Sequence, residues 1–396
     1  MSTVVAAAKL APGAEKPIRV MVVDDAIVVR SLLARWIDAE PDMQIVAALR
    51  TGREAVARIE ESDADVVVLD IDMPELDGIS ALPLLLQKKH GLVVIMVSTL
   101  TRRSAEISLR ALALGAADYV PKPQGARDAT TSIPFRSELI EKIRTLGRRA
   151  APPVVTPILA YANAPGRTAP PYGNGAVAPH APKSPRPVEK PGVIQLRPFA
   201  AVAPRVLLIG ASTGGPQALT TLIERLPAAI DRAPVLIAQH MPATFTMVLA
   251  EHLSRAGGRG AHEAEHGEPV LAGGIYVAPG GRHMRVVRKG GGIEIALGDD
   301  PPINFCKPAV DALFSSAAAV WGAGTLALVL TGMGADGARG SADIVAAGGS
   351  VMAQDQATSV VWGMPRAVAQ AGLCAAVLPL DRMAPKIIRL FSGDRW

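Results

Sequence analysis

The stretch GASTGG, from Gly210 to Gly215, displays one serine hydroxyl in a turn lined by glycines. It follows the apolar run RVLLI, so a strand is expected to end at this turn. Its letters match G-x-S-x-G, in which a serine nucleophile stands on a sharp turn between a strand and a helix. A glycine-rich turn in the same place also suits a phosphate or a dinucleotide. The turn alone leaves both a nucleophile and a phosphate cradle open.

A serine nucleophile requires a histidine base and an acid that orients this base. The usual α/β-hydrolase order of serine, acid and histidine is disfavoured, because no histidine follows His283 and Asp231 precedes a strand. His240 ends the apolar run VLIAQH, and Asp336 follows the run TLALVL. Because the carboxyl ends of parallel strands meet at one edge of a sheet, we expect Ser212, His240 and Asp336 to meet there. The glycine-rich segment before Asp336 could also aim main-chain N–H groups at an oxyanion.

Simpler roles exist for each of these residues. Asp336 could cap the helix that follows it, and His240 could be an ordinary residue at a strand end. A dinucleotide site would use an acid about 20 residues beyond the glycine turn to bind a ribose. The chain has Gln239 and His240 there, and a base in place of an acid favours hydrolysis.

A second group of polar residues lies at strand ends in the first 150 residues. The runs RVMVVDD, DVVVLDID, LVVIMVST and ADYVPKP are typical of parallel strands that are buried on both faces. Their ends carry Asp24, Asp25, Asp70, Ser98 and Lys122. Converging carboxylates repel one another unless a hard cation lies among them, and Mg²⁺ prefers such oxygen ligands. The hydroxyl and the lysine could hold a phosphoryl group on one aspartate. Helix capping explains any one of these acids but not the whole set.

The two groups of polar residues at strand ends, one in the first 150 residues and one around Ser212, require two α/β domains. We expect a disordered tail over 1–16, a doubly wound domain over 17–146, a flexible Pro/Ala-rich linker over 147–203 and a mostly parallel α/β domain over 204–392. A β-hairpin is expected in the second domain, from GIYVAPGGRHMRVV and GIEIAL. The linker is basic, so binding of an acidic partner is the alternative to a solvated tether.

Composition narrows the class of protein. The chain has 49% hydrophobic and 19% charged residues, as a globular protein does, and a net charge of +5. No run of lysines and arginines interleaved with aromatic residues is present, so no nucleic-acid partner is expected. Two cysteines without metal spacing fit a reducing cytoplasm. Residues 312–335 carry no charge, but their glycines favour a helix, a turn and a strand over a membrane span.

The first domain resembles the response-regulator receiver family. The matching residues are the paired acids Asp24 and Asp25, the motif LDIDMPELDG around Asp70, Ser98, and the Lys122 to Pro123 pair. The resemblance implies a flavodoxin-like sheet of five parallel strands and phosphorylation of Asp70 by a histidine kinase. It also implies Mg²⁺ binding by Asp24, Asp25, Asp70 and the main-chain carbonyl of Asp72, a phosphoryl switch of Ser98 and Lys122, and a Lys-Pro bond that tends to be cis.

The second domain resembles the catalytic domain of the CheB family of chemotaxis methylesterases. The motifs IGASTGGP, AQHMP and LTGMGADGARG carry this resemblance. It implies Ser212 as nucleophile, His240 as general base and acid, Asp336 as orienting carboxylate and the main-chain N–H of Met333 in the oxyanion hole. The esterase site would need no cofactor.

The same resemblance supplies the substrate and the partners. It implies hydrolysis of glutamate methyl esters on chemoreceptors, deamidation of receptor glutamines, and the histidine kinase CheA as phosphodonor. The protein would be cytoplasmic and would meet membrane receptor arrays only through the receptors. We expect the unphosphorylated first domain to cover the Ser212 site. A non-catalytic adaptor that binds receptors is the alternative hypothesis.

Overall fold

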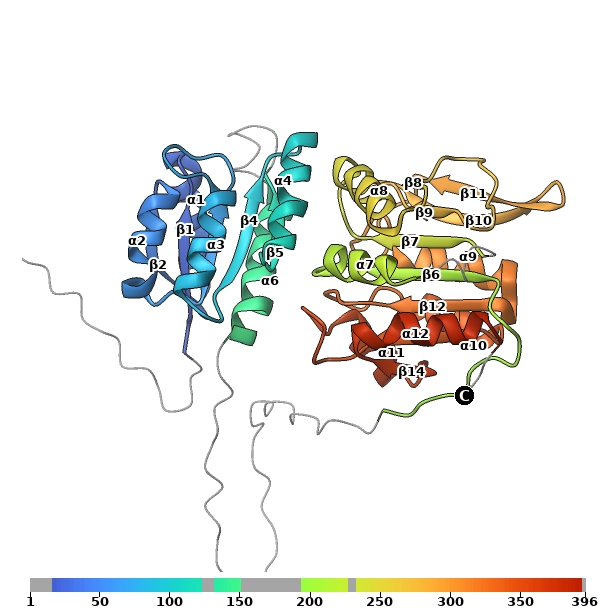
Figure 1. The fold of residues 1–396 in the computed structure, drawn as a ribbon. Coiled ribbons are helices and arrows are strands. Elements are labelled where there is room, and N and C mark those ends of the chain that lie inside the picture. The colour runs from blue at the N-terminus through green and yellow to red at the C-terminus, as the bar shows by residue number, and fades with distance from the viewer. Residues whose placement is uncertain (1–15, 123–131, 151–193, 227–232, 394–396) are drawn as a thin grey trace, which may run out of the picture. The chain divides into compact units, whose positions relative to one another are not determined.

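The structure is a computed structural model that describes residues 16–122, 132–150, 194–226 and 233–393. The first domain contains one parallel sheet in the order β2-β1-β3-β4-β5 (Figure 1). Its strands are β1 (Ile18–Val23), β2 (Met43–Leu49), β3 (Val66–Asp70), β4 (Val93–Ser98) and β5 (Asp118–Pro121). Its helices are α1 (Ile27–Asp38), α2 (Gly52–Ser62), α3 (Gly78–Lys88), α4 (Arg102–Ala113) and α6 (Ile133–Ala150).

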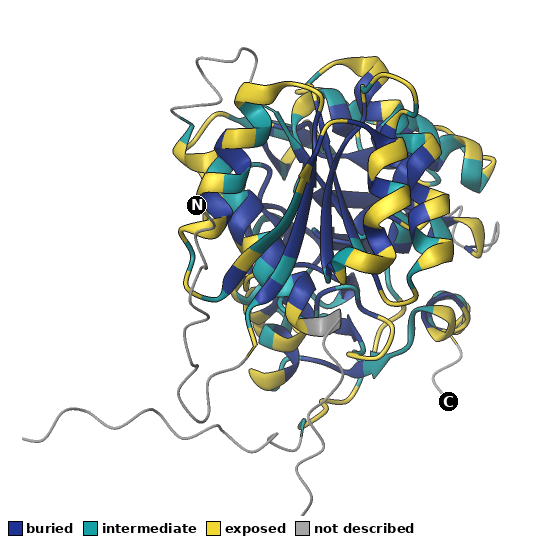
Figure 2. Cartoon of the chain, turned by 90° about the vertical axis from the view of Figure 1, so that its left-hand side faces the viewer, coloured by how far each residue is buried: buried dark blue, intermediate teal, exposed yellow. Residues whose placement is uncertain are grey.

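Side chains of the central strands enter two separate cores. Met21, Leu69 and Met96 belong to the core that also holds residues of α2, α3 and α4. Their neighbours Val68 and Ile95 belong to the core that holds residues of α1 and α6. Successive side chains of a strand point to opposite faces, so a strand that is covered on both sides reads as a continuous apolar run. Figure 2 shows this pattern as buried strands beneath helices with exposed outer faces.

The four apolar runs of the first domain form β1, β3, β4 and β5, as predicted. The fifth strand of the receiver-like sheet is β2, at the edge, and only its first and last residues are buried. Its sequence therefore carries a weaker apolar signal.

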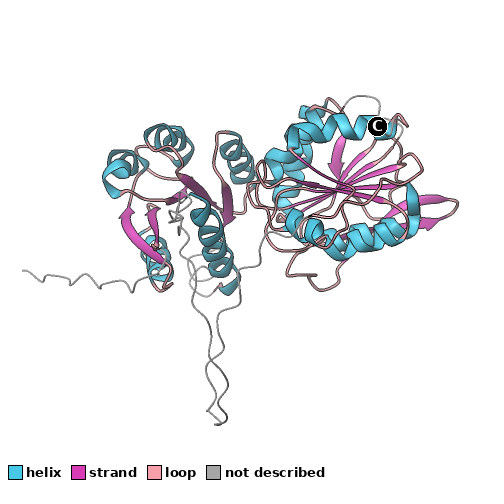
Figure 3. Ribbon diagram, turned by 90° about the horizontal axis from the view of Figure 1, so that it is seen from below, coloured by secondary structure: helices cyan, strands magenta, loops and turns pink. Residues whose placement is uncertain are grey.

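The second domain contains a seven-stranded sheet in the order β14-β13-β12-β6-β7-β9-β8, with parallel pairing throughout. Its strands are β6 (Val206–Ala211), β7 (Val235–Gln239), β8 (Ala261–Glu263), β9 (Ile275–Val277), β12 (Thr325–Val329), β13 (Ser350–Gln354) and β14 (Ala376–Leu378). Helices cover both faces of this sheet (Figure 3): α7 (Gly215–Glu224), α8 (Ala243–Gly257), α9 (Val310–Trp321), α10 (Ala338–Ala346), α11 (Met364–Gln370) and α12 (Leu380–Phe391). The two-domain α/β prediction is confirmed.

The β-hairpin is shorter than the sequence pattern suggested. It consists of β10 (His283–Lys289) and β11 (Gly292–Gly298), which pair antiparallel. Gly290 and Gly291 form its tip and have φ values of 59° and 82°. A two-residue hairpin turn of type I′ requires positive φ at both positions, which glycine adopts without strain. The segment GIYV before it belongs to β9 of the main sheet, because the glycines at 280 and 281 end the apolar run.

In the structure, both ends of the segment predicted as a linker, 147–203, are part of the neighbouring domains. Residues 147–150 continue α6, and residues 194–203 lie against the second domain, where Ala200 N donates to Ser350 Oγ at 2.8 Å. Residues 151–193, the tail over 1–15 and Pro123 lie outside the described residues. In the described part of the chain, no helix has the length and apolarity that a membrane crossing requires. Residues 312–335 form most of α9, a 3-10 turn, β12 and a loop.

Candidate functional site

Three adjacent strands bring the predicted catalytic residues to one edge of the second sheet. Ser212 directly follows β6, His240 directly follows β7, and Asp336 lies in the loop after β12. β6 lies between the other two strands in the sheet. Main-chain hydrogen bonds fix the loops, from Ser212 N to Thr331 O at 3.0 Å and from His240 N to Ala211 O at 3.1 Å. Parallel pairing therefore brings together residues that are far apart in the sequence.

Glycines permit the close approach of these loops. A Cβ atom on Gly332 would lie 2.8 Å from the Cβ atom of Ser212 and would also clash with the sulfur of Met364. Gly214, two residues after Ser212, has a φ of 75°, which side chains disfavour. Any side chain at Gly332 would push the serine or its neighbours out of place.

His240 and Asp336 form a buried hydrogen-bonded pair. His240 Nε2 lies 2.8 Å from Asp336 Oδ2, and the Asp336 side chain is only 2% exposed. The same carboxylate accepts hydrogen bonds from the main-chain N–H groups of Val310, Asp311 and Gly337. Val310 and Asp311 begin α9, whose N-terminus favours a negative charge. The acid therefore caps α9, and not the helix that follows it in sequence.

The charges of this pair reinforce each other. Burial alone would raise the pKa of Asp336, but the hydrogen bonds from His240 and from the main chain lower it below its usual value. Burial alone would lower the pKa of His240, but hydrogen bonds with Asp336 and Cys306 raise it to about 9. An imidazolium ion facing a carboxylate is thus the stable state of this structure near neutral pH.

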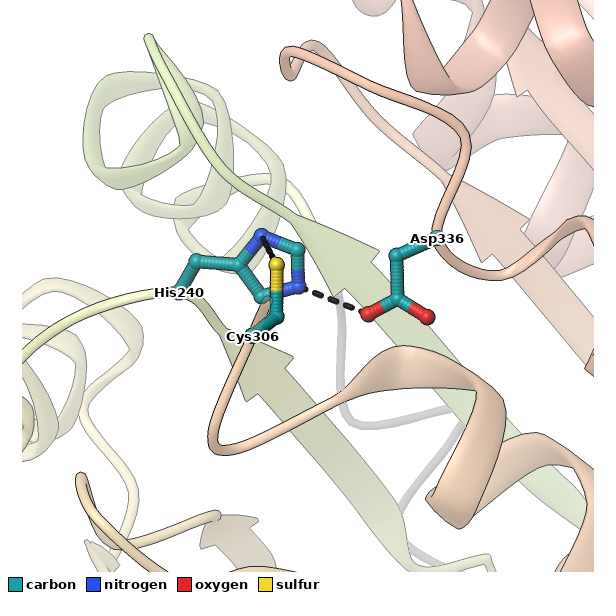
Figure 4. A group of neighbouring side chains, drawn as sticks. All are labelled: His240, Cys306 and Asp336. Atoms are coloured by element: carbon teal, nitrogen blue, oxygen red, sulfur yellow. Dashed lines mark hydrogen bonds and ion pairs between the residues drawn. The ribbon is translucent and has the colours of Figure 1, made fainter. Parts of the chain in front are cut away.

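Cys306 is the third member of this group, and no motif in the sequence predicted its position beside His240. Its Sγ atom lies 3.4 Å from His240 Nδ1, the ring nitrogen that Asp336 does not contact (Figure 4). Among the described residues, no hydrogen bond joins the Ser212 hydroxyl to His240. Nδ1 is therefore the nitrogen that is left for Ser212, and the thiol is its neighbour in this structure.

Met333 follows Gly332 in the same loop. Within the described part of the chain, its main-chain N–H has no hydrogen-bond acceptor, whereas the N–H of Gly332 donates to Val361 O at 3.0 Å. A main-chain N–H without an acceptor, one residue after the glycine that packs against Ser212, is the kind of donor that an oxyanion requires.

The polar residues of the first domain also meet at a sheet edge. Lys122 Nζ lies 2.8 Å from Asp24 Oδ2 and 2.8 Å from Asp70 Oδ1. Carboxylate oxygens of Asp24, Asp25 and Asp70 all lie within 4.8 Å of one another. Burial, the largest cause, and the nearby charge of Asp24 raise the pKa of Asp70 to about 6, although Lys122 acts in the opposite direction. A divalent cation among these oxygens would offset their repulsion, so the residues fit Mg²⁺.

The remaining predicted residues of this site lie around it. Ser98 ends β4 and is buried, and its hydroxyl lies 3.0 Å from that of Ser108. Asp25 is exposed. Asp72 is also exposed and lies two residues beyond Asp70, in the loop before α3. Asp25 and Asp72 therefore form the solvent-exposed side of this site.

Comparisons with known proteins agree with this arrangement. Residues 207–387 match the family model for the CheB methylesterase, and residues 20–133 match that for the response regulator receiver domain. A protein-glutamate methylesterase/protein-glutamine glutaminase of Rhodopseudomonas palustris is 58% identical over 96% of both chains. One of the same name from Nitrobacter hamburgensis is 58% identical over 100% of both chains. The CheB methylesterase catalytic domain of Thermotoga maritima is 39% identical, with a TM-score of 0.46 over 48% of this chain and all of that one. The chain therefore belongs to the CheB family of protein-glutamate methylesterases/protein-glutamine glutaminases, with a receiver domain and a methylesterase domain.

Proposed function

We propose that the chain hydrolyses glutamate methyl esters of proteins and deamidates protein glutamines, with Ser212, His240 and Asp336 as its catalytic residues. The observation that carries this proposal is the 2.8 Å hydrogen bond between His240 and Asp336 beside the glycine-lined turn of Ser212. The names of the 58% identical relatives support the substrate class.

In the proposed reaction, His240 Nδ1 accepts the proton of Ser212 while Oγ attacks the ester carbonyl. The main-chain N–H of Met333 donates to the oxyanion that forms. The imidazolium then gives the proton to the leaving methoxide, so methanol departs and an acyl-enzyme remains. Water attacks the acyl-enzyme with His240 again as base, which releases glutamate and restores Ser212. With a glutamine substrate, ammonia leaves in the first step. Asp336 holds the imidazole and stabilises its charge without taking up the proton.

The raised pKa of His240 bears on this mechanism. A pKa of about 9 means that the imidazole is mostly protonated near neutral pH, and a protonated imidazole cannot accept the proton of Ser212. Activity should therefore rise with pH until His240 is neutral. The thiol of Cys306 contributes to this pKa, so it also contributes to the pH at which the enzyme works.

In the first domain we propose that Asp70 accepts a phosphoryl group. Asp24, Asp25, Asp70 and the carbonyl of Asp72 would hold Mg²⁺, and Lys122 and Ser98 would bind the phosphoryl oxygens. When bound, the cation would neutralise the carboxylates and the incoming phosphate charge. The Lys122 ammonium, which contacts both Asp24 and Asp70, is placed to follow the phosphoryl group after transfer.

Phosphorylation is proposed to activate the esterase by changing contacts next to Ser212. Thr213 Oγ1 donates a hydrogen bond of 2.8 Å to Asp118 Oδ2, and both side chains are buried. Asp118 begins β5, and Lys122 directly follows this strand. Lys122 and Asp118 thus lie at opposite ends of β5. A phosphoryl group on Asp70 that draws Lys122 toward it would shift this short strand and, with it, the contact between Asp118 and Thr213.

The proposed biological setting follows from the family. The substrates would be methylated chemoreceptors, the phosphodonor would be the chemotaxis histidine kinase CheA, and the protein would act in the cytoplasm. A receiver domain supports a histidine kinase as phosphodonor in general, and the identity of CheA is the finer part of the proposal.

Methanol release from methylated receptors, with and without a small phosphodonor and Mg²⁺, tests this function. The wild-type chain should release methanol, faster with the phosphodonor. Ser212→Ala should bind receptors but release none, and Asp70→Asn should keep its unstimulated rate and lose the stimulation. Equal methanol release by Ser212→Ala would exclude the proposed nucleophile. Receptor binding without methanol release by the wild-type chain would favour a non-catalytic adaptor.

A further inference from the structure

A two-residue turn beside His240 presents an aromatic side chain to solvent. Ile303 and Cys306 form an antiparallel bridge in which each main-chain N–H donates to the carbonyl of the other, at 3.1 and 2.8 Å. Asn304 and Phe305 form the tip of the turn. Phe305 is 103% exposed, and it is the only aromatic residue among the exposed large hydrophobic residues of the described chain.

The backbone at this tip suits asparagine but not phenylalanine. Asn304 and Phe305 have φ values of 51° and 64°. A two-residue turn with positive φ at both positions is of type I′, for which asparagine followed by glycine is the preferred pair. Asparagine tolerates this left-handed conformation, whereas an aromatic residue is strained in it. Glycine at position 305 would form the turn without strain, so phenylalanine there is explained by its side chain and not by the fold.

The turn is attached to the catalytic residues on both sides of Phe305. The Asn304 side-chain amide donates to Asp311 Oδ2 at 3.1 Å and lies 3.4 Å from Asp336 Oδ1. On the other side, Cys306 Sγ lies 3.4 Å from His240 Nδ1. These contacts fix the position of the Phe305 backbone at the rim of the catalytic centre. A fixed position is what a recognition residue needs, because less freedom is then lost on binding.

We propose that Phe305 is a substrate-recognition residue, whose ring packs against apolar side chains of the protein segment that carries the esterified glutamate. This proposal rests on the proposed esterase function. The methyl ester itself offers few atoms for binding, so preference for a protein over a small ester requires contacts with neighbouring residues. A rigid, exposed aromatic ring supplies a large apolar area at low entropic cost. The partner surface is therefore an apolar part of the segment that carries the esterified glutamate.

The test compares Phe305→Gly with the wild-type full-length chain, both with phosphodonor and Mg²⁺. Three quantities are measured: kcat/KM for methanol release from methylated receptors, kcat/KM for p-nitrophenyl acetate, and the melting temperature. Leu271→Ala is the matched control, because Leu271 is 60% exposed and lies in the loop before β9, at the other edge of the sheet from Ser212. Phe305→Leu keeps apolar area without the aromatic ring.

In Phe305→Gly, the ratio of receptor to small-ester kcat/KM should fall about tenfold or more, mainly through a higher receptor KM. Its melting temperature should stay the same or rise, because glycine adopts positive φ freely. Phe305→Leu should lie between glycine and the wild type, and Leu271→Ala should leave the ratio unchanged. An unchanged ratio in Phe305→Gly would overturn the proposal, as would an equal loss on both substrates with a lower melting temperature. If the wild-type chain hydrolysed neither ester, the proposed function would fail instead.

Discussion

Removal of the Cys306 thiol tests how the structure tunes the catalytic imidazole. Hydrogen bonds with Asp336 and Cys306 outweigh burial and raise the pKa of His240 to about 9. A base must be neutral to accept a proton, and with this pKa about one imidazole in a hundred is neutral at pH 7. Cys306→Ala removes one hydrogen-bond partner and keeps the other. The pKa of His240 should then fall, and each unit of decrease makes neutral imidazole about ten times more abundant at pH 7.

The assay is kcat/KM for p-nitrophenyl acetate between about pH 6 and 10, a range that spans the pKa of free histidine and the raised pKa of His240. Ser212→Ala supplies the blank for spontaneous hydrolysis. In the wild-type chain the rate should rise with pH and reach half its plateau near pH 9, where half of His240 is neutral. Cys306→Ala should show a lower midpoint and a faster rate at pH 7. Cys306→Ser keeps a polar partner for Nδ1 and should lie between the two.

Two results would refute this reasoning. A midpoint that is the same in Cys306→Ala and the wild type would mean that the thiol does not influence the base. A lower plateau in Cys306→Ala would mean that the thiol positions His240, which is a different role. Asp336→Asn is the contrasting variant, because it removes the charge that stabilises imidazolium and also its orientation. Its rate should fall at every pH, by up to ~10⁴-fold.

Three further predictions follow from the geometry. Gly332→Ala should lower both the melting temperature and the esterase rate, because its Cβ atom would lie 2.8 Å from that of Ser212; a fully active variant would contradict the proposed crowding. Without Mg²⁺, the Asp70 carboxyl should titrate near pH 6 in NMR spectra, because burial and the charge of Asp24 raise its pKa, and added Mg²⁺ should lower this midpoint; a midpoint in the usual range of aspartate without Mg²⁺ would contradict the raised pKa. Lys122→Ala should fold but lose phosphorylation-stimulated esterase activity, and retained stimulation would exclude the lysine from the switch.

The residues at the carboxyl ends of the central strands were predictable because these strands are buried on both faces. Such strands appear as continuous apolar runs, and their last residues are easily read. Ser212, His240 and Asp70 each end such a run or follow it directly, so parallel topology was enough to predict their neighbours. The half-buried edge strand β2 gave no such run, and the four runs of the first domain therefore omitted it.

The positions of the residues in the loop before α9 could not be predicted from the sequence. Asn304, Phe305 and Cys306 lie in a segment without periodicity, and no spacing links them to His240. Their position depends on a turn with positive φ and on contacts with residues distant in the sequence. Asp336 was expected to orient His240, but its second role, capping α9, depends on how α9 packs beside β12. Tertiary contacts of this kind leave no local pattern in the sequence.

The central claim is that Ser212 forms the acyl-enzyme with a glutamate side chain. The most direct measurement is mass spectrometry of the active-site peptide after rapid acid quenching of a reaction with a methylated receptor peptide. The account predicts a mass increase of the peptide acyl group on the Ser212 peptide, present in the wild-type chain and missing in Ser212→Ala. A wild-type chain that releases methanol at its full rate while the label lies on Cys306, or on another residue, would contradict it.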